Sequence, residues 1–265
     1  MSGAFQQVAA SRIYFVVPHK GGRNASEPLL RRGAMTSSPV PLHSVRGRLQ
    51  LSDEVAAHLR DQVMSGVLRP GEFIRPEVVA TQLGVSVTPV REALLLLRGE
   101  DVVRLLPRRG FAVAPLTRVD VEDLFDVQAR LAGELAARAV RRAGPEDLAG
   151  LADLNRRLVA AVTAQSPDGI EYFEHHFHRA INLTADSRKL AYVLRSASQY
   201  LPRRFFTADE HWRKAVDRDH EQILAAFRDK NAEGARAAVE AHILDGRLRL
   251  LQHLDEVGFW ADGHS

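Results

Sequence analysis

Apolar positions recur at helical spacing from Ser52 onward, and they predict three short helices in the first patterned part of the chain. Ser52 is expected to cap the first helix, whose apolar stripe stops at Gly66. A second short helix closes at Gly84, and the third is expected to be capped by Ser86 or Thr88. Because a tight turn containing glycine joins the last two helices, the pattern predicts a helix-turn-helix.

Two β-prone runs follow the third helix, at residues 102–106 and 111–114. The residues between them are Pro107-Arg108-Arg109-Gly110, which combine a turn signal with two positive charges. These runs predict a hairpin with a basic tip, which is the wing of a winged helix.

Beyond Pro115 the apolar pattern is helical to the end of the chain. Thr117 and Asp120 have the spacing of a capping box and open a long helix that is expected to end near Arg142. Pro202 is expected to kink or end the fourth of six helices. The five helical stretches that follow the first long helix are expected at about residues 145–164, 169–184, 187–206, 212–229 and 232–256, and Pro202 lies in the one at 187–206.

Short connections between these helices predict an antiparallel bundle. The expected fold class is therefore mainly α, with an N-terminal winged helix-turn-helix followed by an all-helical antiparallel bundle. We expect four parts along the chain: a flexible tail at 1–46, a winged helix-turn-helix domain at 47–116, an all-α domain at 117–257 and a short tail at 258–265.

The composition excludes several classes of protein. The chain has 265 residues, 45% of them hydrophobic and 26% charged, which is typical of globular proteins. It contains no cysteine, and this excludes a disulfide framework, a cysteine zinc site and a thiol nucleophile. No apolar run approaches the roughly 18–20 residues needed to span a membrane, so we expect a soluble, cytoplasmic protein with no membrane partner.

Charge is distributed unevenly along the chain. Residues 1–118 hold 16 Lys and Arg against 9 Asp and Glu, whereas residues 119–265 hold 20 against 24. A polyanion must be met by local positive charge, so this asymmetry favours a nucleic-acid-binding first half. The alternative is chance together with a basic tail.

The leading turns of the third helix carry the side chains that suit DNA contact. Ser86 and Thr88 offer hydroxyl groups for phosphate, and Arg91 is long enough to reach guanine or phosphate. The alternative for Arg91 is an ordinary ion pair with Glu92 or Asp101, or simple exposure to solvent.

The first patterned part of the chain resembles the winged helix-turn-helix of GntR-family bacterial transcription regulators over about residues 51–115. The resemblance implies that Ser86, Thr88 and Arg91 contact an operator and that the wing tip, with Arg108, Arg109 and Gly110, approaches the minor groove. Val87 stands where members usually have Arg, which implies a different operator sequence. The motifs that carry the resemblance are Gly66-Val67-Leu68-Arg69-Pro70-Gly71, Gln82-Leu83-Gly84-Val85-Ser86-Val87-Thr88-Pro89-Val90-Arg91-Glu92-Ala93-Leu94 and Arg108-Arg109-Gly110-Phe111.

Three histidines and one carboxylate lie on apolar helix faces in the second half of the chain. Glu174 and His178 are four residues apart and share one face of a helix. His220 and His242 each lie on the apolar stripe of a further helix. Together they suit a first shell for Zn²⁺, Ni²⁺ or Mn²⁺. The alternative is that they are separate core histidines, each satisfied by its own partner.

Residues 119–256 resemble the all-helical effector domain called FCD. The resemblance implies that Glu174, His178, His220 and His242 bind a divalent metal, although Glu174 replaces the usual Asp. It also implies a small organic acid as effector. Gln128 stands where many members carry an Arg that helps to hold this acid. Four arginines are candidate substitutes for it: Arg130, Arg195, Arg203 and Arg204.

We therefore expect a homodimeric, ligand-responsive transcription regulator that binds a palindromic double-stranded DNA operator and is not an enzyme. One alternative is a repressor that senses the metal ion itself. A less favoured alternative is a metal-dependent hydrolase on a helical bundle, with a carboxylate such as Glu174 as the general base. The hydrolase hypothesis leaves the winged motif without a role, and no HExxH helix accompanies it.

Overall fold

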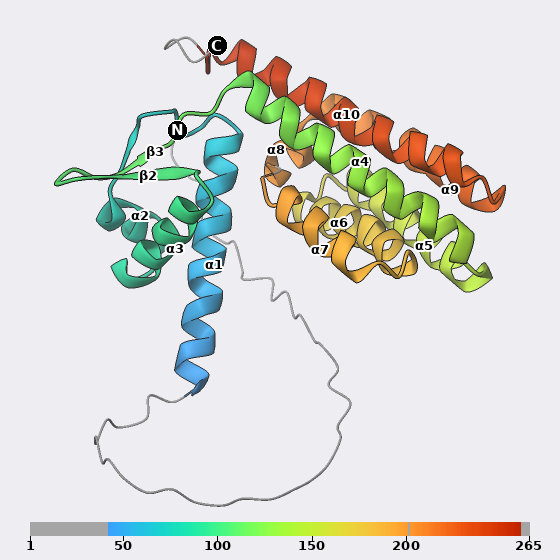
Figure 1. The fold of residues 1–265 in the computed structure, drawn as a ribbon, viewed down its shortest axis with the longest axis horizontal. Helices are drawn as coiled ribbons and strands as arrows, with labels where there is room; N and C mark the ends of the chain where they lie inside the picture. The colour runs from blue at the N-terminus through green and yellow to red at the C-terminus, as the bar shows by residue number, and fades with distance from the viewer. Residues whose placement is uncertain (1–41, 201, 261–265) are drawn as a thin grey trace, which may run out of the picture. The chain divides into compact units, whose positions relative to one another are not determined.

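The computed structural model describes residues 42–200 and 202–260 (Figure 1). The first part contains α1 (Leu42–Met64), α2 (Pro76–Leu83) and α3 (Val87–Gly99). It also contains an antiparallel sheet of order β1-β3-β2, formed by β1 (Phe73–Ile74), β2 (Val103–Leu106) and β3 (Gly110–Val113). The predicted winged helix-turn-helix is thus confirmed, and β1 is an addition to it.

Local signals set the ends of the short helices. Pro76 occupies the first turn of α2, and Gly84 ends it in the left-handed conformation with φ of 66°. Ser86 is the residue before α3, so of the two expected caps it holds the N-cap position. Between β2 and β3, Arg108 and Gly110 both have positive φ, at 63° and 90°. This turn lets the hairpin reverse within three residues.

The start of α1 differs from the sequence-based expectation. The helix begins at Leu42, and Ser52, the expected cap, is a buried residue inside it. The reason is that the apolar spacing of the helix continues upstream through Leu49, Val45 and Leu42 without a proline. Residues 42–46 are therefore helical, and the other residues of the expected tail at 1–46 lie outside the described residues.

Seven helices make up the second part within the described residues. The expected helix at 187–206 is two helices, because Pro202 interrupts it as predicted. Thr117 and Asp120 form the predicted capping box at the start of the first helix of this part. The seven helices are α4 (Arg118–Arg142), α5 (Pro145–Thr163), α6 (Pro167–Thr184), α7 (Arg188–Ser198), α8 (Arg203–Ala208), α9 (Glu210–Arg228) and α10 (Ala232–Glu256).

Helices α4 and α10 lie side by side and run antiparallel (Figure 1). Arg236 of α10 contacts Glu134 of α4 at 2.7 Å, and Arg118 at the start of α4 binds Asp255 at the end of α10. The bundle core beneath them contains large apolar side chains from four helices, which are Leu135, Phe177, Ile223, Phe227 and Val239. None of the described helices is both long and apolar enough to cross a membrane.

The end of α10 contacts the end of α1. The guanidinium of Arg69 donates hydrogen bonds to the carbonyl oxygens of Val257 and Gly258, at 2.7 and 3.2 Å. A ring nitrogen of His253 lies 3.2 Å from the carbonyl oxygen of Ser65. The last turn of the bundle is therefore bonded directly to the segment that leads into the winged helix.

Candidate metal centre and nucleic-acid interface

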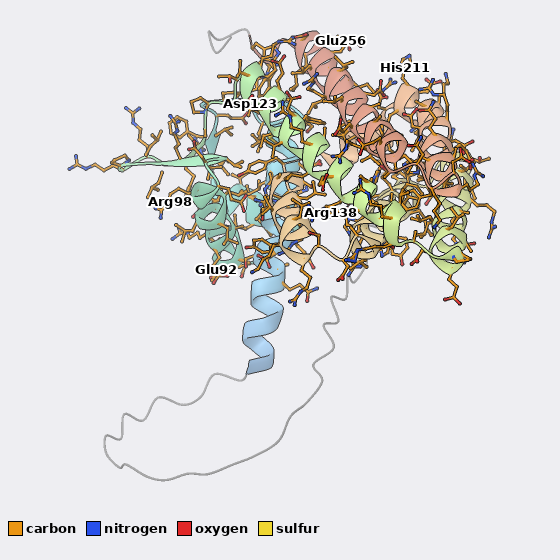
Figure 2. The ribbon with its side chains drawn as sticks, turned by 45° about the vertical axis from the view of Figure 1, so that its right-hand side comes forward. Glu92, Arg98, Asp123, Arg138, His211 and Glu256 are labelled. Atoms are coloured by element: carbon orange, nitrogen blue, oxygen red, sulfur yellow. The ribbon has the colours of Figure 1, made fainter. Side chains whose placement is uncertain are left out.

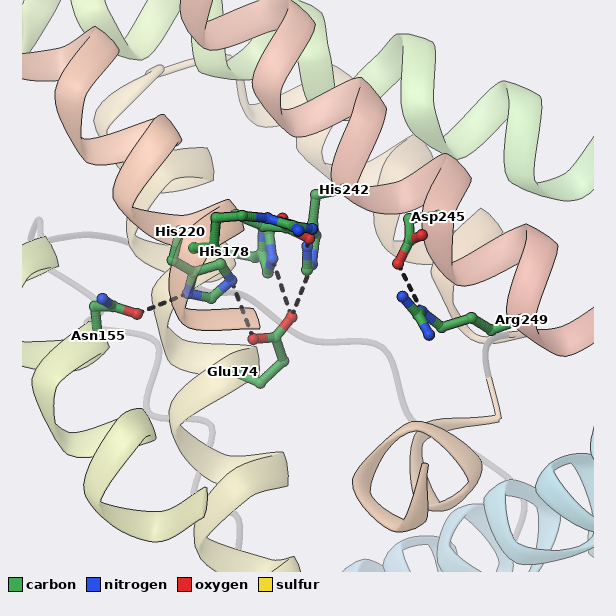
Figure 3. Close-up of polar contacts among 9 residues, drawn as sticks. Asn155, Glu174, His178, His220, His242, Asp245 and Arg249 are labelled. Carbon is green, nitrogen blue, oxygen red and sulfur yellow. Dashed lines mark hydrogen bonds and ion pairs between the residues drawn. The ribbon is translucent and has the colours of Figure 1, made fainter. Parts of the chain in front are cut away.

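Three helices bring Glu174, His178, His220 and His242 together inside the bundle (Figure 3). Each residue offers one ligand atom, and these atoms all lie within 4.8 Å of one another. Glu174 and His178 come from α6, His220 comes from α9 and His242 comes from α10. The four residues named from sequence as a ligand set thus form one cluster.

The amphipathic pattern of each helix explains why these side chains point inward. Ile170, Phe177 and Ile181 are buried on α6, and they turn the face with Glu174 and His178 towards the core. His220 lies on the buried stripe of α9, and its ring stacks on that of Phe177 at a centroid distance of 4.0 Å. The side chain of His220 is fully buried, with 0% exposure.

The Glu174 carboxylate is the common partner of the three imidazole rings. Nε2 of His178 and Nε2 of His242 lie 3.1 and 3.3 Å from its Oε1 atom. Nε2 of His220 lies 3.2 Å from its Oε2 atom. All three Nε2 atoms therefore point towards the same small volume.

The surroundings shift the pKa values of these groups in different directions. Burial lowers the pKa of His220 to about 4, against the opposing effect of Glu174. Burial also acts on His242, but the carboxylates of Asp219 and Glu174 outweigh it and raise its pKa to about 9. Burial raises the pKa of Glu174, but His220 and His178 outweigh this effect and hold the pKa well below its usual value.

The residues of the cluster fit a divalent metal ion. Buried Oε2 of Glu174 and buried Nε2 of His220 face each other at 3.2 Å in the centre of the cluster, and within the described part of the chain neither atom forms a hydrogen bond of good geometry. An unpaired buried polar atom costs about 1–3 kcal/mol, so such atoms call for a partner. Three imidazole nitrogens and one carboxylate oxygen are also a usual donor set for Zn²⁺, Ni²⁺ or Mn²⁺.

Two residues around the cluster were missed by sequence reasoning. Asn155 of α5 places its Oδ1 3.1 Å from Nδ1 of His220. Asp219 of α9 places an oxygen 3.6 Å from Nδ1 of His242. Asn155 lies 65 residues before His220 and follows no motif, so nothing in the sequence indicated it. Asp219 had one weak signal, because it precedes a candidate ligand on the same helix.

The arginines considered for the effector lie in different surroundings. Arg130 of α4 is exposed, and Arg195 of α7 is exposed with its guanidinium 5.3 Å from the centre of the Tyr192 ring. The side chains of Arg203 and Arg204 lie outside the described part of the structure. Gln128, by contrast, is only 1% exposed, and its buried Nε2 has no hydrogen-bond partner among the residues that the structure describes.

The candidate DNA-contacting residues are all at the surface of the winged helix. Ser86 precedes α3, Thr88 lies in its first turn, and both are exposed. Arg91 is exposed and forms an ion pair of 3.0 Å with Glu77 of α2, rather than with Glu92 or Asp101. Exposed pairs of this kind contribute about 0–1 kcal/mol, so Arg91 is readily available to another partner.

The wing adds a second group of cations. Arg108 and Arg109 are exposed in the turn between β2 and β3, and Gly110 begins β3. Nitrogen-tipped side chains extend from the tip of this hairpin, and Arg98 projects from α3 on the same part of the molecule (Figure 2). This arrangement of a helix with an exposed first turn and a basic hairpin suits double-stranded DNA.

Two family models match the chain, and together they cover both parts. "Bacterial regulatory proteins, gntR family" matches residues 51–113, and "FCD domain" matches residues 123–245. The chain belongs to the GntR family and carries an FCD domain. It is therefore a transcriptional regulator, and the cluster described above lies within the FCD match.

Relatives of this chain include two transcriptional regulators of Escherichia coli (strain K12). The HTH-type transcriptional regulator McbR is 27% identical over 77% of this chain and 93% of its own length. The Uxu operon transcriptional regulator is 26% identical over 80% of this chain and 91% of its own length. The solved structure of E. coli McbR/YncC matches with a TM-score of 0.61 and 26% identity, over 76% of this chain and 97% of that one.

Proposed function

We propose that this GntR-family regulator senses a small organic acid at a divalent metal held by Glu174, His178, His220 and His242. The observation that carries the proposal is the convergence of three imidazole Nε2 atoms on one carboxylate inside the FCD domain. A Zn²⁺, Ni²⁺ or Mn²⁺ ion bound there supplies a Lewis-acidic position for a carboxylate oxygen of the effector.

The winged helix provides the DNA-binding activity in this proposal. Ser86 and Thr88 bind phosphate at the first turn of α3. Arg91 leaves its exposed ion pair with Glu77 and contacts a base or a phosphate instead. Arg108, Arg109 and Gly110 form the wing that meets the minor groove. A homodimer places two recognition helices in successive major grooves, about 34 Å apart, on a palindromic operator.

Helix α10 supports a route from the effector site to the DNA-binding domain. It carries His242 near its middle, and near its end His253 approaches the carbonyl oxygen of Ser65 at 3.2 Å. An effector that binds one packing of α10 more tightly changes operator affinity by the same ratio, because the two binding equilibria are linked. Arg130, Arg195, Arg203 and Arg204 remain the proposed candidates for a further contact with the acid.

The recognition-helix assignment is tested by Arg91→Ala. The variant is expected to lose retention of an operator selected in vitro, because it lacks the guanidinium that contacts DNA in the first turns of α3. Its metal content is expected to equal that of the wild type. Undiminished retention in a gel-shift assay would show that Arg91 is not a DNA contact.

The metal assignment is tested by the double variant His178→Ala, His220→Ala. Loss of two nitrogen ligands is expected to remove bound metal, as measured by elemental analysis of the purified proteins. Equal metal in the wild type and the double variant would refute the ligand set.

Titrating operator binding with metal alone, and then with an organic acid, distinguishes an organic-acid sensor from a regulator for which the metal itself is the signal. We expect metal alone to leave operator affinity nearly unchanged, and an organic acid added to the metal-loaded protein to change it. A full response to metal without any organic ligand would instead identify a metal-sensing repressor.

A further inference from the structure

Asn155 is a buried polar residue with two assigned contacts and no place among the ligands. It lies on α5 and is only 3% exposed. Its Nδ2 donates a hydrogen bond to Oδ1 of Asp217 at 3.3 Å. Its Oδ1 faces Nδ1 of His220 at 3.1 Å (Figure 3).

The contact with Asp217 fixes which end of the Asn155 amide meets His220. A carboxylate only accepts hydrogen bonds, so the NH₂ group of the amide must face Asp217. The carbonyl oxygen then faces His220, and it also only accepts. Nδ1 of His220 must therefore carry the ring proton, and it donates a hydrogen bond to Oδ1 of Asn155.

The position of this proton determines what the other nitrogen of His220 can do. In a neutral imidazole with a protonated Nδ1, Nε2 carries the free lone pair. That Nε2 is fully buried and lies 3.2 Å from Oε2 of Glu174, which as a carboxylate oxygen has no proton to donate to it. The lone pair thus points to the centre of the cluster, where a ligand to metal is needed.

We propose that Asn155, held by Asp217, is a positioning residue that fixes the Nδ1-protonated form of His220 and aims its Nε2 lone pair at the metal. This inference rests on the proposed metal site. It adds a fourth helix, α5, to a centre whose four candidate ligands come from α6, α9 and α10. It also assigns a role to Asp217, which is exposed and touches no ligand.

The surroundings of His242 differ from those of His220. Oδ2 of Asp219 lies 3.6 Å from Nδ1 of His242, which is too long for a hydrogen bond, and Nε2 of the same ring lies 3.3 Å from Oε1 of Glu174. The positioning role of Asn155 therefore concerns His220.

Two variants separate positioning from packing. Asn155→Leu keeps the size of the side chain but removes the acceptor for Nδ1 of His220. The swap Asn155→Asp, Asp217→Asn exchanges the amide and the carboxylate, so the residue at 155 still accepts from His220 and is still bonded to residue 217. Zn²⁺ affinity is measured by competition with a chromophoric chelator, and folding by thermal melting.

We expect Asn155→Leu to weaken Zn²⁺ binding about 10–100-fold, which is the usual effect of losing such a partner of a ligand. The swap variant is expected to bind within a few-fold of the wild type. Wild-type affinity in a folded Asn155→Leu protein would overturn the positioning role while leaving the proposed function intact. Wild-type protein that binds none of Zn²⁺, Ni²⁺ and Mn²⁺ in the same competition assay would overturn the proposed function instead.

A measurement on the metal-free wild type keeps the inference testable if Asn155→Leu does not fold. Nitrogen-15 NMR of the His220 ring distinguishes the two neutral forms. We expect the proton on Nδ1 in the wild type and in the swap variant. A His220 ring protonated on Nε2 in the wild type would refute the inference whatever the metal affinity.

Discussion

His220 and His242 lie in one cluster, but their surroundings shift their pKa values in opposite directions. His220 faces the neutral amide of Asn155, and burial lowers its pKa to about 4. His242 lies between the carboxylates of Asp219 and Glu174, which together overcome burial and raise its pKa to about 9. At the residue scale, burial favours the neutral form of both rings; the two carboxylates beside His242 outweigh it, whereas Glu174 does not outweigh it at His220.

Glu174→Gln tests the carboxylate of the cluster. Removing the negative charge is expected to weaken Zn²⁺ binding by at least about 10-fold, because a neutral amide is a poorer ligand than a carboxylate. In the metal-free protein it is also expected to lower the pKa of His242, since the negative charge that favours the protonated ring is lost. NMR titration and chelator competition measure the two effects.

Glu174→Asp is the matched control for this variant. It keeps the charge and the carboxylate oxygens on a side chain one methylene shorter, so binding is expected to remain much closer to that of the wild type. Equal losses in Glu174→Gln and Glu174→Asp would show that side-chain length, rather than charge, is decisive.

At the scale of the element, single residues at helix ends set the lengths of the helices in the bundle. Oγ1 of Thr117 accepts a hydrogen bond of 3.1 Å from the backbone N–H of Asp120, and the backbone N–H of Thr117 donates one of 2.8 Å to the Asp120 carboxylate. Pro202 separates α7 from α8, since its ring cannot continue a helix. These signals are local, which is why the sequence indicated them.

Thr117→Ala is expected to destabilise the fold by about 1 kcal/mol, because α4 loses one half of its capping box. Thr117→Ser is the control, and it is expected to retain most of the stability because it keeps the hydroxyl group. Chemical denaturation measures the free energy of unfolding in both. An Ala variant as stable as the wild type would show that packing against α10, rather than the cap, sets the start of α4.

At the scale of the whole molecule, the end of α10 is packed against the end of α1. Met64 of α1 and Leu254 of α10 belong to one apolar cluster, which Phe259 also joins. Gly66, just after α1, has φ of 77°, and a Cβ atom there would lie 2.9 Å from Cδ2 of Leu254. A glycine at this position therefore allows both the left-handed backbone and the close approach of α10.

Gly66→Ala and Gly71→Ala form a matched pair that tests this contact. Both glycines have positive φ, at 77° and 79°, but a Cβ atom at Gly71 meets nothing within 4 Å. Gly71→Ala is expected to cost about 1–2 kcal/mol from backbone strain alone. Gly66→Ala is expected to cost more, because Leu254 must also move. Equal losses of stability by calorimetry would refute a tight contact between the two helix ends.

The sequence by itself determined the order of the helices and the winged helix, and it named the four residues that form the cluster. Capping residues, prolines and glycines act within a few residues, so their effect can be read along the chain. Glu174 and His178 are also neighbours on one helix, and the apolar stripes around His220 and His242 indicated which way those residues face. The early start of α1 does not follow from local signals, because Ser52 has the features of a cap while the apolar spacing continues upstream of it.

Only the tertiary structure decided which side chains meet. Asn155 and His220 are 65 residues apart, and Arg91 pairs with Glu77 of another helix rather than with its own neighbours. The proximity of α6, α9 and α10 likewise turned four separate polar residues into one cluster. Such pairings depend on how helices pack against one another, and periodicity in a single sequence specifies the buried face of a helix but not its partner across the core.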